Sequence, residues 1–420
     1  MSLITLNPRP LDRALRERAA SVLPGGVYGH VAADLLWPGA PQFVGRAEGA
    51  HFWDVDGNEY VDLMCSWGPL LLGHRHPAVE EAVARQHGLV DCGNGPSPVM
   101  VELAERLVGV VDHAAWAMFA KNGSDATTLC LTLARAHTSR TTILTAGGAY
   151  HGALPWCTPV ACGVVPGDRA HLAHYVYNDL DSVLAAAETH AGDLAGIVVS
   201  PFKHDAGFDQ ELPDPAFARG VRELCDRTGA LLILDDVRCG FRIAYGSSWE
   251  PLGIAPDLSA WSKGIANGYA LAAVLGAERV RAAAASVFAT GSFWFSGDAM
   301  AASLATLDVL EREDGVAAMQ AWGRRLWDGI EAQARERGVA INLTGHATMP
   351  YLTFPDDDDY ALGELFAAVC AREGLFLHPR HNWFVSTALS DTDLDVALRA
   401  IGCALDAVVA APGRVAALDG

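Results

Sequence analysis

The stretch Ala230-Leu231-Leu232-Ile233-Leu234-Asp235-Asp236-Val237 decides the fold. Its apolar run is short and continuous, which predicts a strand covered on both faces, as in a parallel sheet flanked by helices. Ligands of open α/β sheets bind beyond the carboxyl ends of the strands, so Asp235 is predicted to lie at a ligand site. A carboxylate buried there is costly unless a cation meets it. The alternative interpretation is a helix N-cap or a surface ion pair that follows the strand.

Short apolar runs of the same kind lie on both sides of this stretch, separated by amphipathic helical patterns. The clearest helix is Pro215–Thr228, with Asp214 as its N-cap and Gly229 just past its end. Strands that alternate with helices predict an α/β fold with βαβ units and a mostly parallel sheet. The further strands predicted in this way are Thr142–Thr145, Gly196–Ser200 and Leu271–Gly276.

The two ends of the chain differ from this central pattern. His51–Val55 and Glu59–Leu63 flank an Asp-Gly turn, which predicts a hairpin in an N-terminal arm. Near the other end, the long helical pattern Ala299–Glu313 leads into a smaller α+β region. We expect the two ends to pack together. The predicted parts are 1–73 (N-terminal arm and part of a small domain), 74–295 (large domain) and 296–420 (C-terminal small domain).

Composition excludes several classes of function. With 50 acidic against 30 basic residues, the net charge of −20 argues against nucleic acid or an anionic membrane as partner. There is no signal-peptide pattern and no apolar run of about 18 residues, so a soluble cytoplasmic protein without a membrane span is predicted. Nine scattered cysteines without a CxxC pair predict neither a disulfide framework nor a zinc site, and no metal is expected.

Lysine is rare in this chain, which contains only Lys121, Lys203 and Lys263. Lys263 stands in Trp261-Ser262-Lys263-Gly264, 28 positions after Asp235. An amine can act as a nucleophile, whereas arginine stays protonated in proteins. A bias toward arginine codons would leave the same three lysines without any function, so the rarity alone does not decide between the two interpretations.

Two further segments are placed where a ligand is expected. Gly123-Ser124 opens an apolar helical run, and a helix N-terminus with a close glycine and a capping serine suits a phosphate. An ordinary N-cap without a ligand is the alternative. Tyr150-His151-Gly152 follows the strand Thr142–Thr145, and an aromatic side chain there can cover the face of a planar cofactor. Ordinary core or loop packing is the alternative for this segment.

Together these features predict pyridoxal 5′-phosphate (PLP) chemistry. The lysine would form an imine with the cofactor, the helix N-terminus would bind the phosphate, and the aromatic side chain would stack on the ring. Asp235 would keep the ring nitrogen protonated, so that the ring takes up the electrons left when a substrate Cα–H proton is removed. The amine of Lys263, once displaced from the imine, would move that proton.

Several segments of the chain carry a family resemblance: Leu23-Pro24-Gly25-Gly26-Val27, Phe52-Trp53-Asp54-Val55-Asp56-Gly57, Ser66-Trp67-Gly68-Pro69, Ala149-Tyr150-His151-Gly152, Gly240-Phe241-Arg242 and Lys263-Gly264. They resemble the class III aminotransferases, and within that class glutamate-1-semialdehyde 2,1-aminomutase and its relatives. The resemblance implies the fold type I (aspartate-aminotransferase-like) PLP-dependent transferase fold, with a large mixed-sheet domain of seven strands and a small α+β domain built from both termini. It also implies a homodimer with active sites at the subunit interface.

The resemblance also implies roles for single residues. Lys263 would be the Schiff-base lysine and Asp235 the partner of the pyridinium nitrogen. The remaining cofactor-binding residues would be Gly123 and Ser124 at the phosphate, Tyr150 and Val237 on the two ring faces, and Ser292 in place of the threonine that reaches the partner subunit's phosphate. The residues expected to contact substrate are Trp67, Tyr28, His151 and Arg380.

Departures from the family pattern bear on the substrate. Ala32 stands where the aminomutase has an arginine that binds the substrate carboxylate, which argues against conversion of glutamate-1-semialdehyde. The C-terminal segment Asn382–Thr387 lacks the arginine of other members, and Arg380 is the nearby candidate to replace it. Cys239 has two interpretations, as a second proton donor or as inert packing.

The sequence therefore predicts a PLP-dependent aminotransferase that moves an amino group between an amine or amino acid donor and a carbonyl acceptor. The segment Lys263–Gly268 is similar to transaminases of amino-sugar natural products, which suggests that setting. An aminomutase or epimerase acting on a single substrate is the first alternative. A PLP-binding protein without turnover is the second.

Overall fold

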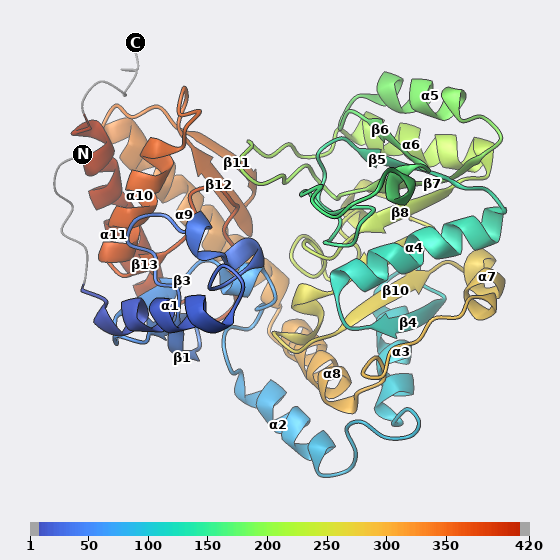
Figure 1. Ribbon diagram of the computed structural model, residues 1–420, viewed down its shortest axis with the longest axis horizontal. Helices are drawn as coiled ribbons and strands as arrows, with labels where there is room; N and C mark the ends of the chain where they lie inside the picture. The colour runs from blue at the N-terminus through green and yellow to red at the C-terminus, as the bar shows by residue number, and fades with distance from the viewer. Residues whose placement is uncertain (1–7, 412–420) are drawn as a thin grey trace.

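The computed structural model describes residues 8–411, and a seven-stranded sheet forms its larger part (Figure 1). In space the strands follow the order β4-β10-β9-β8-β7-β5-β6, and β5 to β9 all run parallel. β10 is antiparallel to both of its neighbours, β9 and β4. The strands are β4 (Trp116–Ala120), β5 (Thr142–Ala146), β6 (Leu172–Tyr175), β7 (Leu194–Val199), β8 (Leu231–Asp235), β9 (Leu258–Trp261) and β10 (Ala272–Gly276).

Helices cover both faces of this sheet, which explains the continuous apolar run of β8. Successive side chains of a strand point to opposite faces. Leu231 and Ile233 accordingly join the core beneath α4, while Leu232 and Leu234 join the core beneath α5 and α6. The predicted parallel α/β arrangement is confirmed, and the reversed β10 makes the sheet mixed. The covering helices are α4 (Gly123–Thr138), α5 (Leu180–Thr189), α6 (Pro215–Thr228) and α7 (Arg281–Ser286).

Local signals set the bounds of α6 as the sequence predicts. Its N-cap Asp214 accepts a hydrogen bond of 2.7 Å from the Ala216 N–H. Its C-cap Gly229 has a φ of +73°, a conformation that glycine adopts at little cost. The other helices are α1 (Pro10–Val22), α2 (Pro77–His87), α3 (Val99–Val110), α8 (Gly297–Arg312), α9 (Gly315–Glu336), α10 (Ala361–Arg372) and α11 (Asp391–Val409).

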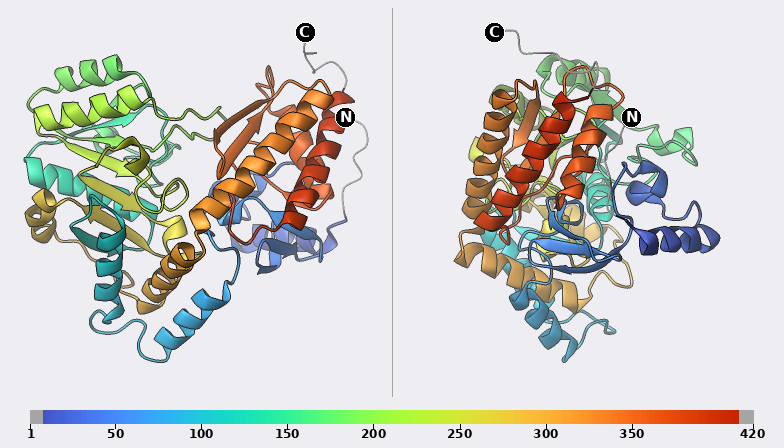
Figure 2. Two further views of the ribbon diagram at one scale, coloured as in Figure 1. Left: turned by 180° about the vertical axis from the view of Figure 1, so that it is seen from behind. Right: turned by 90° about the vertical axis from the view of Figure 1, so that its left-hand side faces the viewer.

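Both ends of the chain meet in a second, four-stranded sheet of order β1-β2-β3-β13. The predicted hairpin is formed by β2 and β3, and β13 from the C-terminal region pairs parallel with β3. Helices α10 and α11 contact β13, and α9 packs against α11, as the rear view in Figure 2 shows. The expectation that the two ends pack together is confirmed. The four strands are β1 (Val44–Glu48), β2 (His51–Asp54), β3 (Glu59–Asp62) and β13 (Leu375–Phe376). A separate two-stranded hairpin consists of β11 (Asn342–His346) and β12 (Met349–Thr353).

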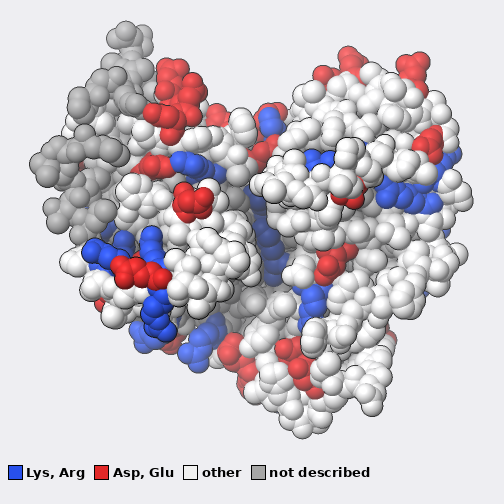
Figure 3. All heavy atoms as spheres, viewed as in Figure 1, with Lys and Arg blue, Asp and Glu red and all other residues white. Residues whose placement is uncertain are grey.

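We call the seven-stranded sheet with α2 to α8 the large lobe, and the four-stranded sheet with α1, α9 to α11 and the β11–β12 hairpin the small lobe. The surface is hollowed between the two lobes, and basic atoms lie within that hollow (Figure 3). The proposed domain boundaries at residues 73 and 295 remain predictions; α8, which follows the second boundary, packs against α2 and α3. No helix within residues 8–411 is long and apolar enough to cross a bilayer.

Candidate active site

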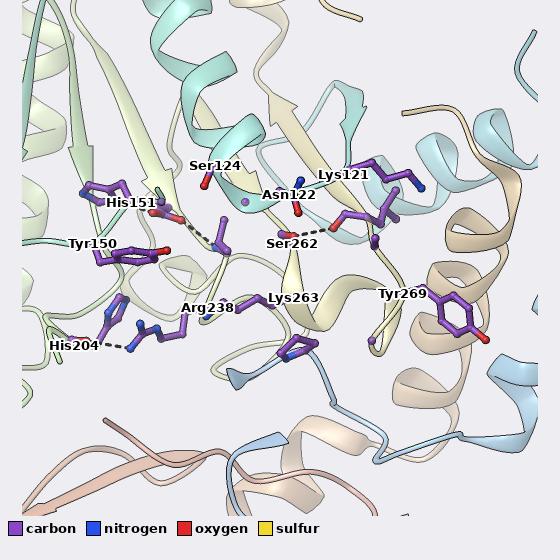
Figure 4. Close-up of a pocket in the computed structure, with 18 residues that line it drawn as sticks. Lys121, Asn122, Ser124, Tyr150, His151, His204, Arg238, Ser262, Lys263 and Tyr269 are labelled. Carbon is purple, nitrogen blue, oxygen red and sulfur yellow. Dashed lines mark hydrogen bonds and ion pairs between the residues drawn. The ribbon is translucent and has the colours of Figure 1, made fainter. Parts of the chain in front are cut away.

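A cavity of about 280 Å³ opens at the carboxyl ends of β4, β5, β8 and β9 (Figure 4). The reversed β10 lies between β4 and β9, so these two strands point the same way and their carboxyl ends meet at one edge. The position agrees with the rule that predicted a ligand site beyond Asp235. Seven of the predicted site residues line this cavity: Gly123, Ser124, Tyr150, His151, Asp235, Val237 and Lys263.

The N-terminus of α4 forms one end of the cavity. The backbone N–H groups of Gly123 and Ser124 make no hydrogen bond to other described residues, so they are free to bind an anion. A side chain at Gly123 would place its Cβ 2.7 Å from Val237 Cγ1, which shows why the close approach here requires glycine. Asn122 is the N-cap of α4, so the expectation that Ser124 caps this helix is wrong. Ser124 Oγ instead accepts a hydrogen bond of 3.0 Å from the Ala153 N–H.

Gly152 holds the loop after β5 against Ser124. Its φ is +129°, and a Cβ at this position would overlap Ser124 Oγ. We expect Gly152→Ala to push the Ser124 side chain and the start of α4 out of place. PLP binding should then weaken by about 10-fold or more, because the anion-binding geometry is lost. Titration of the apoprotein with PLP, followed by its visible absorption, measures this change.

Gly163→Ala is the matched control for this prediction. Gly163 also has a positive φ, +82°, but an added Cβ there meets no atom within 4 Å. The control should therefore carry the backbone strain of an alanine at positive φ without the clash. Equal PLP affinity in the two variants would contradict the assigned contact between Gly152 and Ser124.

Asp235 is buried and held in place by His151. The His151 ring donates from Nδ1 to Asp235 Oδ2 over 2.7 Å, because an ionised carboxylate can only accept. The other oxygen, Oδ1, accepts a hydrogen bond of 3.2 Å from the Val237 N–H. Within residues 8–411, Asp235 has no ion pair with a lysine or arginine, and His151 Nε2 has no hydrogen-bond partner. The carboxylate is thus fixed in direction and still lacks the cation that a buried negative charge requires.

Lys263 lies in the short helical turn Lys263–Ala266 that follows β9. Its φ is +47°, a strained value that the surrounding structure must enforce. Burial, together with the positive charge of Arg238, lowers the pKa of the Lys263 ammonium to about 7. A substantial fraction of this amine is therefore neutral near pH 7 and able to act as a nucleophile.

Four predicted residues do not line the cavity in the single chain. Arg380 pairs with Glu364, and its guanidinium lies over the Tyr360 ring, 5.0 Å from the centroid. Trp67 packs edge-on against the ring of His30. Tyr28 is exposed, and Ser292 lies in an exposed loop where its carbonyl accepts from Cys92 Sγ.

The cavity residues that sequence reasoning missed include Arg238, His204 and Tyr269. Arg238 directly follows the Asp235-Asp236-Val237 motif, and that position could have signalled it. His204 and Tyr269 are in loops that carried no recognisable signal. Cys239, considered as a proton donor, is fully buried outside the cavity wall, and burial raises its thiol pKa far above the usual range. This location supports the packing interpretation.

Comparison with known proteins places this cavity in a family. A family model described as "Aminotransferase class-III" matches residues 38–402. The chain belongs to the class III aminotransferases. Among class III relatives, an aminopentol aminotransferase from Sphingopyxis macrogoltabida is 49% identical over 95% of this chain and 94% of its own length. A glutamate-1-semialdehyde 2,1-aminomutase from Chloroflexus aurantiacus is 34% identical over 93% of this chain and 95% of its own length.

Solved structures of similar sequence agree with the fold described above. The PLP internal aldimine form of FumI from Sphingopyxis sp. MTA144 has a TM-score of 0.95 and 48% identity, covering 97% of this chain and 98% of that chain. An omega-transaminase from Sphaerobacter thermophilus has a TM-score of 0.86 and 25% identity, covering 96% and 98% of the respective chains. The predicted fold type I architecture and the predicted PLP-dependent aminotransferase class are confirmed.

Proposed function

We propose that this chain transfers an amino group from an amine donor that has no carboxylate to a carbonyl acceptor, in two half-reactions with PLP. The observation that carries the proposal is the convergence of a Lys263 amine, a fixed Asp235 carboxylate and a free helix N-terminus in one cavity. The donor we propose is an amino alcohol with several hydroxyl groups, because the relative with 49% identity is named for an aminopentol.

The residues present fit PLP. Asp235 is a buried carboxylate that lacks a cation, which a protonated ring nitrogen would supply. The free N–H groups at the start of α4 suit the phosphate. Tyr150 and Val237 both line the space between these two ends, and we propose that they cover the two faces of the ring.

PLP, when bound, supplies an electron sink for the bond broken at the substrate carbon next to nitrogen. The chain's own residues supply the rest. Asp235, directed by His151, stabilises the positive charge on the ring nitrogen. Lys263, with a pKa near 7, accepts and returns a proton at that carbon.

The proposal is tested by adding amines to the PLP-loaded protein. An amino polyol, a simple alkylamine and glutamate should be compared, with conversion of the PLP absorption band to that of the pyridoxamine form as the signal. We expect conversion with the amines that lack a carboxylate, and recovery of the PLP band when a 2-oxo acid is added. No conversion with any amine would contradict the proposal. Complete turnover of one substrate without an acceptor would favour the aminomutase or epimerase alternative.

We also propose that two copies form a homodimer with the cavity at their interface. Hydrogen bonds from Cys92 and Ser296 bring the loop around residues 89–92 against the loop around 291–296. Both loops expose large apolar side chains, including Leu89 and Phe293, and such patches mark interfaces. In the dimer, Ser292 would approach the partner's phosphate site.

The dimer is tested by light scattering during size-exclusion chromatography. We expect a molar mass of twice the 44.4 kDa of one chain. Phe293→Asp should shift the population toward the single-chain mass, because a charge would then have to be desolvated at the interface. Elution of the unmodified protein as a single chain at micromolar concentration would contradict the proposal.

A cytoplasmic location is the last part of this proposal. All nine cysteines carry free thiols, which is the usual state in a reducing compartment. Cell fractionation with detection of the untagged protein tests it, and recovery outside the cytoplasmic fraction would contradict it.

A further inference from the structure

Arg238 presents an unused hydrogen-bonding edge inside the cavity. Its side chain follows β8, is only 8% exposed, and lies close to Lys263 in Figure 4. Nη1 donates to the His204 carbonyl over 3.0 Å and to Asn382 Oδ1 over 2.7 Å. Nε and Nη2 make no hydrogen bond with the described residues, and none of their carboxylates forms an ion pair with Arg238. Neither of these two nitrogens is enclosed by protein atoms, so both remain accessible from the cavity.

A second buried arginine, Arg242, has a structural role and serves as a comparison. Arg242 donates from Nη1 and Nη2 to three backbone carbonyls, those of Val385, Gly68 and Leu70, and it does not line the cavity. Arg242 therefore ties the two lobes together through its terminal nitrogens. Arg238 uses a single nitrogen in this way, and its side chain lines the cavity together with Lys263.

The other positively charged side chains near the cavity already have a partner or an assigned role. Lys121 lies beside the α4 N-terminus, at the end assigned to the phosphate, and Lys263 is the nucleophile. Arg380 is neutralised by Glu364, and position 32 is an alanine. Among the described residues that line the cavity, Arg238 is thus the remaining positive charge available to a substrate.

We propose that Arg238 binds the carboxylate of the amino acceptor through Nε and Nη2, and that this acceptor is a small 2-oxo acid. The inference rests on the proposed function and names its second substrate. Parallel hydrogen bonds from two guanidinium nitrogens match the two oxygens of a carboxylate. The carbonyl of a 2-oxo acid is one bond from its carboxylate, which brings that carbonyl to the Lys263 side of the cavity.

The same arrangement explains how one cavity serves two different substrates. An amine donor without a carboxylate leaves Arg238 bound only to His204 and Asn382. The acceptor then occupies the free edge. Because Arg238 also lowers the pKa of the neighbouring Lys263 ammonium, a carboxylate bound to Arg238 should raise that pKa and favour proton uptake at the amine.

The experiment measures both half-reactions separately in Arg238→Gln and Arg238→Lys by rapid mixing. With Arg238→Gln, we expect the pyruvate concentration for half-maximal reaction of the pyridoxamine form to rise by about 100-fold. The amine half-reaction, and the reaction of the pyridoxamine form with acetaldehyde, which has no carboxylate, should slow far less, because they are affected only through the raised pKa of Lys263. The pyruvate concentration for half-maximal reaction of Arg238→Lys should fall between those of Arg238→Gln and the unmodified protein, because lysine keeps the charge but loses the planar pair of donors.

Two further variants test whether Arg238 or Arg380 binds the carboxylate of the acceptor. Arg380→Gln tests the competing candidate, and the exposed Arg325→Gln is the control for loss of a surface arginine. An effect of Arg380→Gln on pyruvate, with none from Arg238→Gln, would overturn the proposal. Equal loss of both half-reactions in Arg238→Gln and Arg238→Lys would also overturn it, since a structural role predicts that pattern.

Calorimetric titration with propanoate, a carboxylate that cannot react, separates this inference from the proposed function. Propanoate should bind the unmodified PLP-loaded protein and bind Arg238→Gln about 100-fold more weakly, even if no tested amine reacts. Equal propanoate affinity would overturn the role of Arg238 while leaving amine transfer intact. If Arg238→Gln does not fold, as judged by its melting temperature, the same titration with Arg238→Lys and Arg380→Gln decides the question.

Discussion

Lys263→Ala is expected to lower kcat by about 10⁵-fold or more, because the group that carries the cofactor and moves the proton is then absent. Neither of the other lysines can replace it. Lys203 pairs with Glu211 over 2.6 Å, and Lys121 lies at the α4 end of the cavity, away from the proton to be moved. The measurements are kcat under saturating substrates and the amount of PLP that survives desalting.

Lys263→Arg and Lys203→Ala complete this experiment. Lys263→Arg keeps a positive charge but provides no nucleophile, so it should be as inactive as Lys263→Ala. Lys203→Ala removes a partly exposed ion pair and should keep nearly full activity. Turnover by Lys263→Ala within about 10-fold of the unmodified protein would refute the role assigned to this lysine.

Asp235→Asn is expected to lower kcat by about 10³-fold, because the amide cannot balance a positive charge on the cofactor ring nitrogen. The size of this change should exceed that of His151→Asn, which removes only the group that orients the carboxylate and should cost about 10- to 100-fold. The measurements are kcat and the rate of the amine half-reaction for each variant.

Asp236→Asn is the matched control, since it changes the adjacent carboxyl. Asp236 is buried outside the cavity wall and accepts hydrogen bonds of 3.2 Å from Ser247 Oγ and the Ser248 N–H. Burial raises the pKa of this carboxyl to about 7, so a neutral amide is a conservative replacement near neutral pH. If Asp236→Asn were as damaging as Asp235→Asn, the distinct role of Asp235 would be refuted.

The sequence predicts well those parts of the fold that depend on residues close together in the chain. The bounds of α6 match because both ends carry capping residues. The burial of β8 matches because a continuous apolar run fits only a strand covered on both faces. The reversed direction of β10 was not foreseen from its residues, because strand direction depends on partners that are distant in sequence.

The candidate site shows the same division between local and tertiary signals. Asp235 was identified because it ends a predicted strand at the sheet edge where ligands bind. Lys263 was identified because lysine is rare in this chain and because Lys263-Gly264 resembles the family motif. The ion pair of Arg380 could not be predicted, because its partner Glu364 lies on α10 and reaches it only when the small lobe folds. Likewise, the free edge of Arg238 depends on His204 and Asn382, which come from loops of different lobes.

The most direct test of the central claim is borohydride reduction of the PLP-loaded protein, followed by mass analysis of its peptides. Reduction makes the bond between PLP and a lysine permanent, and this chain has only three lysines among which to choose. We predict that the added mass lies on the peptide containing Lys263. Its location on Lys121 or Lys203, or its absence from all three, would contradict this account.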